Sequence, residues 1–586
     1  MGANMKRAAK KITALVLCTM MTVQLGACGV SKGGGGSSPG ESKPAGTQEA
    51  AGETADGEVT LKVGYARDTS FEFQGDETVD DNSWIQLYKE NGVNLEVIYN
   101  VDASQKEEKL AQTIMSGDYP DFMDVNPKNF TGWAEQGIFH DLTEGYEKYA
   151  SDEVKAYYNS EAGERALKAA TVDGKLYGMP AIATPNDTMP LLWIRKDWLD
   201  NLGLDIPETI DDFYEVARAF TEDDPDQDGQ NNTYGLALNG KEVFHVVGDV
   251  ASFFEMFGAQ PGHFSNVVPF IDVDGHAAFG GAKSDEMKEG LTLIRDMYDN
   301  GFISKDFITA GQDQIEQDMA AGKVGMAFSI FYAAQTPWKN ALETQPDADF
   351  ISVPIPGRTA GERGQGFYTA IPGQYYTLSS KCEDIEAFFK IINLGVHYLA
   401  QPDTLSQEDY EKYNGLPGKY TGFTVALAAF GVPFKNMVAW ERHQNAMKTG
   451  DTSELNAENL RDYNAMMAYY ENRDRRAELN EEELAAFDAG ILYWSVWGNE
   501  HCAYQSYHEM DDMNNYLYSA YDAAATEKMN ECSTTLITLT KETLIDIITG
   551  NKEVDAYDEF LNTWNSLGGA DITKEADAWY QESQTE

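Results

Sequence analysis

An acidic loop has the residue types and the spacing of a calcium-binding site. The run Asp-Pro-Asp-Gln-Asp-Gly-Gln-Asn-Asn places carboxylates at Asp224, Asp226 and Asp228, which are loop positions 1, 3 and 5, and glycine at position 6. The carbonyl of Gln230 and the side chain of Asn232 can supply oxygen at positions 7 and 9, and Ca²⁺ prefers such ligands. We therefore predict a structural Ca²⁺ site. Position 12 is glycine, so the bidentate glutamate of a full EF-hand is missing, and the alternative is a solvated turn.

Aromatic and planar polar side chains are candidates for binding a sugar, because pyranose rings stack on aromatic faces and their hydroxyls need hydrogen-bond partners. The densest group is Tyr493, Trp494 and Trp497, followed by Glu500. Asn126 follows a short apolar stretch that reads as a strand, and ligands of α/β proteins gather at the carboxyl ends of strands. The other candidates are Trp84, Asn186, Asp187, Tyr332 and Trp338. Core packing is the alternative for each aromatic residue.

The N-terminus predicts export and attachment to a membrane. Four basic residues precede an apolar run at 12–23, which ends in Leu25-Gly26-Ala27-Cys28. A basic end, a short apolar run and small residues before the cleavage point are typical of a signal peptide, here residues 1–27. The final four residues resemble the lipobox of bacterial lipoproteins, and this resemblance implies that Cys28 is acylated. The alternative is a plain secreted protein with a cysteine at this position by chance.

Residues 28–57 are predicted to form a flexible tether, because they are rich in Gly, Ser, Pro, Ala, Thr and Glu and cannot bury apolar surface. The remaining chain is long and aromatic enough for two globular lobes. The formal net charge is −52, which makes nucleic acid a poor partner. Cys382, Cys502 and Cys532 remain after Cys28, and we expect them to be free, buried thiols.

Alternating apolar patterns predict an α/β fold. Residues 58–65 and 94–99 read as strands with a helix at 83–91 between them. A helix at 103–115 and a short strand at 121–125 follow. Strands that alternate with helices predict a sheet covered by helices. Residues 406–486 lack strand patterns and are predicted to be an inserted helical subdomain.

Several ordered stretches resemble the extracellular solute-binding proteins of carbohydrate ABC transporters, in particular the LplA-like and alginate-binding subgroup. Gly117-Asp118-Tyr119-Pro120-Asp121 resembles the family's G-x-x-P-D stretch, and Asp173-Gly174-Lys175-Leu176-Tyr177-Gly178 resembles its dGKlYg stretch. Similar matches occur at residues 133–142, 192–209, 298–303, 321–326 and 544–569. Each stretch is also an ordinary turn, helix or strand, so the resemblance depends on their shared order and spacing.

This resemblance implies a two-lobed clamp of the periplasmic-binding-protein type II, with a hinge and added helices. Lobe 1 is expected at 58–184 with part of 374–430, and lobe 2 at 185–365 with much of 431–586. The crossings between them are expected at 184–188 and 365–373. The resemblance further implies a monomer that captures a carbohydrate, most simply an oligosaccharide, and delivers it to the transmembrane subunits of an ABC permease. The cell would be Gram-positive, with the protein held outside by its lipid.

Enzymatic function is the rival interpretation. The Gly-Ser-Ser-Pro-Gly run at 36–40 matches a nucleophile motif but lies in the tether, without the strand and helix that a nucleophile elbow needs. The sequence contains no C-x-x-C, zinc-binding H-E-x-x-H or phosphate-binding loop motif. A surface glycosidase, using two of the many carboxylates, and a lipoprotein that presents ligand to a membrane sensor therefore remain as alternatives.

Overall fold

The computed structural model describes residues 59–67, 73, 77–334, 338–345, 348–370, 372–414, 422–498 and 500–584. The predicted signal peptide, the tether and Cys28 lie outside these residues and stay predictions. Among the described residues, no helix is both long and apolar enough to cross a membrane.

The first sheet has five strands in the order β2-β1-β3-β14-β6. Strand β1 (Val59–Arg67) pairs in parallel with β2 (Val93–Asp102) and β3 (Phe122–Val125), whereas β14 (Tyr375–Leu378) is antiparallel to both β3 and β6 (Met179–Pro180). Side chains two residues apart along β1, such as Leu61 and Val63, are fully buried, as expected for one face of a strand against a core.

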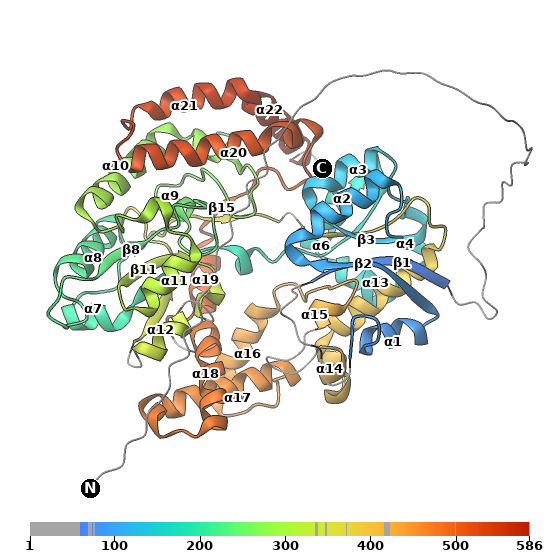
Figure 1. Cartoon of the computed structure of the whole chain (residues 1–586), viewed down its shortest axis with the longest axis horizontal. Helices are drawn as coiled ribbons and strands as arrows, with labels where there is room; N and C mark the ends of the chain where they lie inside the picture. Colours follow the sequence, from blue (N-terminus) through green and yellow to red (C-terminus); the bar gives the residue numbers. More distant parts are fainter. Residues whose placement is uncertain are drawn as a thin grey trace, which may run out of the picture. The chain divides into compact units, whose positions relative to one another are not determined.

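Helices cover this sheet and complete its core. They are α1 (Ser83–Glu90), α2 (Lys106–Ser116), α3 (Pro127–Glu135), α4 (Thr143–Tyr149), α5 (Asp152–Tyr158), α6 (Glu161–Ala169), α13 (Ile385–Ala400), α14 (Gln407–Tyr413) and α15 (Gly422–Val425). The two-residue strands β4 (Thr171–Val172) and β5 (Lys175–Leu176) form a hairpin around Asp173 and Gly174. Figure 1 displays β1, β2 and β3 with α1, α2 and α3 in blue and cyan. We call the apolar interior of this unit the first core.

The second sheet has four strands in the order β12-β7-β11-β8. Strands β7 (Leu191–Arg195) and β11 (Val324–Ser329) are central and antiparallel, with β12 (Phe350–Val353) beside β7 and β8 (Tyr234–Ala237) beside β11. Every residue of β7 and β11 is buried, which indicates that both faces of the sheet are covered.

Each face of the second sheet borders a different core. Leu192 and Ile194 of β7 contribute to the apolar core on one face, which we call the second core. Leu191 and Trp193 contribute to the apolar core on the other face, the third core. Alternate residues of a strand point to opposite faces, so β7 supplies both cores.

Among the described residues, seven helices and one β-hairpin contribute to the second core. They are α7 (Lys196–Leu202), α8 (Ile210–Glu222), α9 (Val250–Glu255), α10 (Ser284–Asn300), α20 (Glu527–Ile548), α21 (Ala556–Trp564) and α22 (Ala570–Ser583), with the hairpin of β9 (Phe270–Val273) and β10 (His276–Phe279). Of the C-terminal helices, α20 contacts both α21 and α22, and α20 and α21 contact α10 (Figure 1). Thr209 caps α8 through a reciprocal capping box with Asp212.

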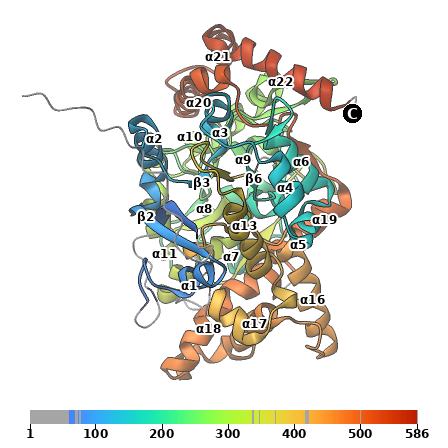
Figure 2. The ribbon, with the colours of Figure 1, turned by 90° about the vertical axis from the view of Figure 1, so that its right-hand side faces the viewer.

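The third core is mainly helical. It contains α11 (Gln312–Ala320), α12 (Trp338–Thr344), α16 (Lys435–Thr449), α17 (Ala457–Asn472), α18 (Glu481–Tyr493), a π-helical turn at Trp494–Gly498 and α19 (Ala503–Met513). Helix α17 contacts both α16 and α18, and these three helices lie together in Figure 2. After α19, the chain forms β15 (Tyr516–Tyr518), which pairs in parallel with β13 (Gly366–Tyr368).

Within the described residues, the chain passes three times between the first core and the second sheet. The first passage lies between Ile182 and Met189, and the second between Ile355 and Tyr375. The third, between Phe430 and Ala439, had no counterpart in the sequence prediction. Residues 406–486, expected to form one helical insertion, instead contribute to two cores: α14 and α15 to the first and α16–α18 to the third.

The fold class predicted from the sequence is confirmed: the structure is a mixed α/β protein with additional helices. The expected elements at residues 58–125 correspond to β1, α1, β2, α2 and β3, but α2 begins at Lys106 because a 3₁₀ turn at Ala103–Gln105 precedes it. Cys382, Cys502 and Cys532 are free and buried, as the sequence predicted.

Candidate ligand-binding site

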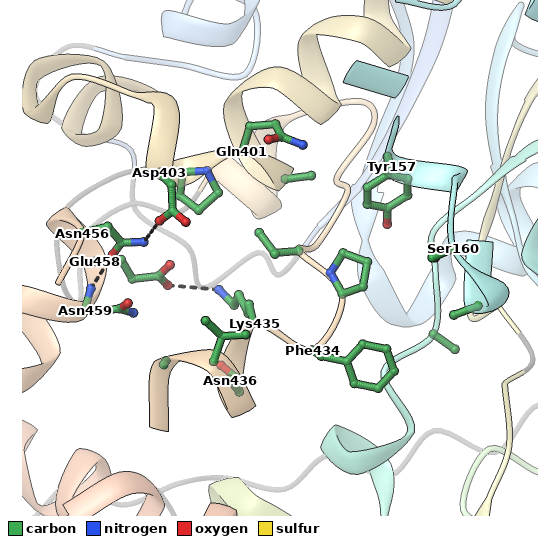
Figure 3. A pocket seen from close by; sticks show the side chains of 18 of the residues that line it. Tyr157, Ser160, Gln401, Asp403, Phe434, Lys435, Asn436, Asn456, Glu458 and Asn459 are labelled. Carbon is green, nitrogen blue, oxygen red and sulfur yellow. Dashed lines mark hydrogen bonds and ion pairs between the residues drawn. The ribbon is translucent and has the colours of Figure 1, made fainter. Parts of the chain in front are cut away.

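A cavity of about 790 Å³ lies where the three passages of the chain meet. Residues of the first-core helices α5 and α6 line it, together with the turn at Pro402–Thr404, the third passage, and α16 and α17 (Figure 3). Its charged lining residues are Arg165, Asp403, Lys435, Arg442, Glu458 and Asp462, and its aromatic ones are Tyr157, Tyr368, Phe434, Trp497 and Tyr518. This combination of charged and aromatic side chains suits a polar ligand with apolar faces.

One group of polar side chains joins the first core to the third core beside the cavity. Arg442 on α16 donates through Nη1 and Nη2 to the two carboxylate oxygens of Asp403, at 3.2 and 2.9 Å. Asn456, the N-cap of α17, donates from its amide to Asp403 at 2.5 Å. The hydrogen bonds from Arg442 hold the pKa of Asp403 below its usual range. Asp403 is therefore ionised at neutral pH.

A second pair lies on the same wall. Lys435 Nζ is 3.0 Å from Glu458 Oε1, and Figure 3 draws this contact across the cavity wall. Burial acts to raise the pKa of Glu458, but the charges of Lys435 and Arg461 outweigh it, so the pKa lies below its usual value. Asp462, one turn further along α17, is 2.6 Å from Arg461; burial nevertheless raises its pKa to about 6.

Phe434 lies at the N-cap of α16 with φ +55°, in the left-handed region that a bulky residue seldom adopts. Its ring lines the cavity, as does that of Tyr157, and both are labelled in Figure 3. Tyr157 is held by its hydroxyl, which accepts the backbone N–H of Ile182 at 3.2 Å. A strained backbone at a cavity is a common sign of a functional constraint, because other contacts must compensate its cost.

Of the aromatic cluster predicted from the sequence, only Trp497 lines the cavity. Its indole N–H donates to the carbonyl of Asn436 at 3.1 Å, and the ring stacks on Tyr493 with centroids 5.6 Å apart. Trp494 faces elsewhere and stacks on Tyr470 at 4.6 Å. Tyr493 thus supports Trp497 from behind, and its pKa is raised to about 12, first by burial and then by the charge of Asp462.

Asp187 and Asn186 lie behind the cavity, in the first passage. Asp187 accepts hydrogen bonds from the hydroxyl of Tyr504 and, at 3.1 Å, from the amide of Asn436. Burial raises the pKa of Asp187, and these two hydrogen bonds act against that shift. Asn186 is buried, and its amide is 3.5 Å from Asp511. Asp187 therefore holds the cavity-lining residue Asn436, and neither Asp187 nor Asn186 lines the cavity itself.

Two predicted binding residues are core residues, which corrects their assignment. Trp84 is 0% exposed in the first core, and its indole donates to the carbonyl of Tyr413 at 3.0 Å. Trp338 is 1% exposed and packs on Phe350, with ring centroids 4.1 Å apart. Neither ring has a face left for a ligand, because protein atoms surround it.

The remaining three predicted residues also lie away from the cavity lining. Asn126 accepts the backbone N–H of Asn129 at 3.0 Å as the N-cap of α3. Tyr332 is half-buried with its ring against Phe331, and the Glu500 side chain is 91% exposed. In the structure Asn126 is a helix cap, Tyr332 packs against a neighbouring ring, and Glu500 lies on the surface.

Sequence reasoning missed most of the cavity, including Tyr157, Asp403, Arg442 and Glu458. Each is a single polar or aromatic residue on an amphipathic helix or a turn, with no motif around it. One signal was available: residues 431–434, Gly-Val-Pro-Phe, break two helical patterns and mark the third passage.

The acidic loop at residues 224–232 brings its three carboxylates together. Oxygen atoms of Asp224, Asp226 and Asp228 all lie within 4.8 Å of one another. Gly229 has φ +77°, and its N–H donates to the Asp224 carboxylate at 3.1 and 3.2 Å. Burial, and then the charges of Asp228 and Asp224, raise the pKa of Asp226, so crowding in the loop disfavours full ionisation. Gln230 and Asn232 donate from their side-chain amides to Asp228, at 2.8 and 3.2 Å.

Comparison with known proteins includes a relative that matches over most of the chain. It is the polygalacturonan/rhamnogalacturonan-binding protein YtcQ of Bacillus subtilis (strain 168), 23% identical over 521 residues, which cover 86% of this chain and 89% of YtcQ.

Two solved structures have the same fold. The alginate-binding protein AlgQ2, determined without calcium ion, has a TM-score of 0.58 and 18% identity, covering 91% of this chain and 100% of AlgQ2. An EF-hand mutant of the Streptococcus pneumoniae substrate-binding protein FusA, in complex with fructo-nystose, has a TM-score of 0.57 and 16% identity, covering 90% and 100%.

The family assignment follows from the sequence itself. Residues 75–396, more than half of the chain, match the model of the bacterial extracellular solute-binding protein. The likeness stated from the ordered sequence motifs is thereby confirmed, and the chain belongs to the bacterial extracellular solute-binding protein family.

Proposed function

We propose that this protein captures an oligosaccharide in the cavity and delivers it unchanged to an ABC permease. The observation that carries the proposal is the cavity itself, which first-core and third-core elements line together at the passages of the chain. A ligand held there contacts both sides at once, so binding favours the closed arrangement of two lobes. In our proposal, lobe 1 comprises the first core, and lobe 2 comprises the second and third cores.

The chemistry of the lining supports a saccharide. Carboxylates accept hydrogen bonds from hydroxyl groups, and the lysine and arginine side chains donate them. Phe434 and Tyr518 supply partly exposed aromatic rings for the apolar faces of sugar rings. The names of YtcQ, AlgQ2 and FusA all refer to saccharide ligands or substrate binding, which agrees with this proposal.

Several observations favour binding without hydrolysis. A glycosidase needs a carboxylic acid with a raised pKa beside a second, ionised carboxylate. Asp403 and Glu458 both have lowered pKa values because cations hold them. Asp462 has a pKa of about 6, but Arg461 engages it, and it is only 3% exposed. The cavity therefore offers a ligand no free general acid among these three carboxylates.

We further propose that Cys28 carries the lipid, that residues 28–57 tether the domain outside the membrane, and that the protein acts as a monomer. A tether of some thirty residues has a root-mean-square reach of about 30 Å. It keeps the receptor near its permease while allowing it to turn. The family of extracellular binding proteins agrees with this placement.

We also propose a structural Ca²⁺ ion in the acidic loop. Asp224, Asp226 and Asp228 would hold it, with oxygens from Gln230 and Asn232. The clustered carboxylates fit a cation, which would offset both causes of the raised pKa of Asp226, first its burial and then the charges of Asp228 and Asp224. The reference to an EF-hand in the name of the FusA mutant supports the same interpretation. When bound, the ion would offset most of this negative charge and stabilise the loop between the end of α8 and the start of β8.

Thermal denaturation against a panel of tri- and tetrasaccharides tests the main proposal. A true ligand raises the melting temperature with concentration, because it binds the folded state only. Chromatography of the same ligand after overnight incubation should return it unchanged. New reducing ends would refute the proposal in favour of a glycosidase, and a panel without any stabilising sugar would refute saccharide binding.

A further inference from the structure

The charges on the cavity wall compensate one another almost completely. Among the described residues that line it, three carboxylates face three cations. Glu458 is paired with Lys435, and Asp403 with Arg442 through two nitrogen–oxygen contacts. Asp462 is engaged by Arg461, which lies outside the lining.

Arg165, the third lining cation, also has a negative neighbour. It is exposed, and its charge acts on Asp522, which lines an adjoining depression with it. Asp522 in turn accepts the N–H of Ala370, a cavity residue, at 3.2 Å. The positive charge of Arg165 is therefore partly offset from behind.

An anionic ligand would meet a cost at such a wall. Its carboxylate would lie beside Asp403 or Glu458 and would have to displace one of them from its cation to gain an ion pair. Removing one partner of a partly buried pair leaves the other carboxylate uncompensated. The net charge of −52 adds a repulsive field around the whole chain.

A neutral sugar meets no such cost. Hydroxyl groups both donate and accept, so they bind to a carboxylate and its cation without separating them. Asn436, Asn456 and Asn459 add uncharged donors and acceptors to the same wall, as Figure 3 illustrates. We infer that the cavity selects neutral oligosaccharides and rejects uronates of the same backbone, through the ion pairs Lys435–Glu458 and Arg442–Asp403.

This inference rests on the proposed function and narrows its ligand. It also separates the chain from two of its relatives, whose names refer to polygalacturonan and alginate. Sequence likeness at 23% does not fix ligand charge, because a few wall residues decide it.

The test compares one ligand in two charge states. Neutral tetrasaccharides (cellotetraose, xylotetraose, mannotetraose, galactotetraose and nystose) and tetragalacturonate are first ranked by calorimetry with the full chain. The best neutral ligand that carries primary hydroxyls is then compared with its uronic-acid counterpart, made by oxidising those groups. We expect the neutral form to bind at least tenfold more tightly. Tighter binding of any uronate than of every neutral sugar overturns the inference but keeps the proposed function. Binding of neither class overturns both.

A variant tests the cause. Glu458→Gln leaves Lys435 without its carboxylate, so the ratio of neutral to uronate affinity should fall about fivefold. Glu471→Gln is the matched control, because it removes the same charge from an exposed residue of the same helix, α17, outside the lining. Melting curves check that both variants fold. An unchanged ratio in folded Glu458→Gln, or an equal change in the control, overturns the role of the pair.

Discussion

Asp403 and Arg442 form a bidentate ion pair that links the first core to the third core beside the cavity. The turn that carries Asp403 follows α13, whereas Arg442 lies in the second turn of α16. The pair connects the first core directly to the third core, and both of its residues line the cavity. In the proposed function, the pair therefore stabilises the closed arrangement of the two lobes, in addition to any contact that it makes with the ligand.

We expect Arg442→Lys to weaken ligand binding about threefold, because lysine keeps the charge but loses the bidentate geometry. A partly exposed pair contributes about 0.2–1 kcal/mol, which corresponds to a change of this size. Calorimetry with the best ligand measures it. Arg358→Lys is the control, since Arg358 makes a similar pair with Glu289 away from the cavity. Equal losses in both variants would contradict the role of Asp403–Arg442.

Trp497→Phe should raise the dissociation constant about tenfold, whereas Trp494→Phe should change it less than twofold. Both residues lie in the same π-helical turn, but only Trp497 lines the cavity and holds the carbonyl of Asn436. Phenylalanine preserves most of the apolar contact, so both variants should fold. Calorimetry and melting curves distinguish the two effects, and similar affinity losses would show that the wall extends to Trp494.

Chelation of calcium should lower the melting temperature, and Asp226→Asn should abolish that response. Ligand saturation at a hundred times the dissociation constant stabilises a folded protein by about 2.7 kcal/mol. Differential scanning calorimetry with and without chelator measures the loss. Glu135→Gln, an exposed substitution on α3, should respond to the chelator like the unmodified protein. If the native protein melts identically in chelator and in Ca²⁺, the loop binds no stabilising ion.

The stability of the protein should fall on acidification partly because of His263. Burial lowers the pKa of its imidazole to about 4, so the unfolded chain binds a proton at pH 5 that the folded state does not. The stability that the neutral ring contributes is complete above the unfolded pKa of about 6.5, and it is lost as the pH falls towards 4. The free energy of unfolding that is lost through His263 amounts to about 2 kcal/mol between pH 7 and pH 5.

Urea denaturation of His263→Asn at both pH values isolates this effect. Asparagine can preserve an acceptor near the position of Nδ1, which contacts Ser265 at 2.6 Å. The variant should lose less stability than the native protein between pH 7 and pH 5. An equal loss would mean that His263 is protonated in the folded state as readily as in the unfolded one.

The sequence predicted the features that depend on local order. Alternation along residues 58–65 identifies β1, and Thr209 followed by Asp212 identifies the start of α8, because these signals involve neighbouring residues. The aspartate spacing at 224–228 likewise predicted the carboxylate cluster. The family motifs predicted the two-lobed α/β architecture, because their order and spacing extend over most of the chain.

The cavity could not be predicted in the same way, because its residues come together only in the folded chain. Asp403 and Arg442 are 39 residues apart, and nothing around either residue distinguishes it from other surface charges. Aromatic type is equally ambiguous: Trp84, Trp338 and Trp497 look alike in the sequence, yet only Trp497 reaches the cavity. Burial decides between core and binding site, and burial is a property of the fold.

The position of β14 has a consequence for the order in which the chain can fold. This strand lies between β3 and β6, although it follows the whole second sheet in the sequence. During synthesis, β3 and β6 emerge first and have no strand between them until residues 375–378 arrive. We therefore expect the second sheet to be complete before the first, and a nascent chain shorter than about residue 380 to expose an unpaired strand edge.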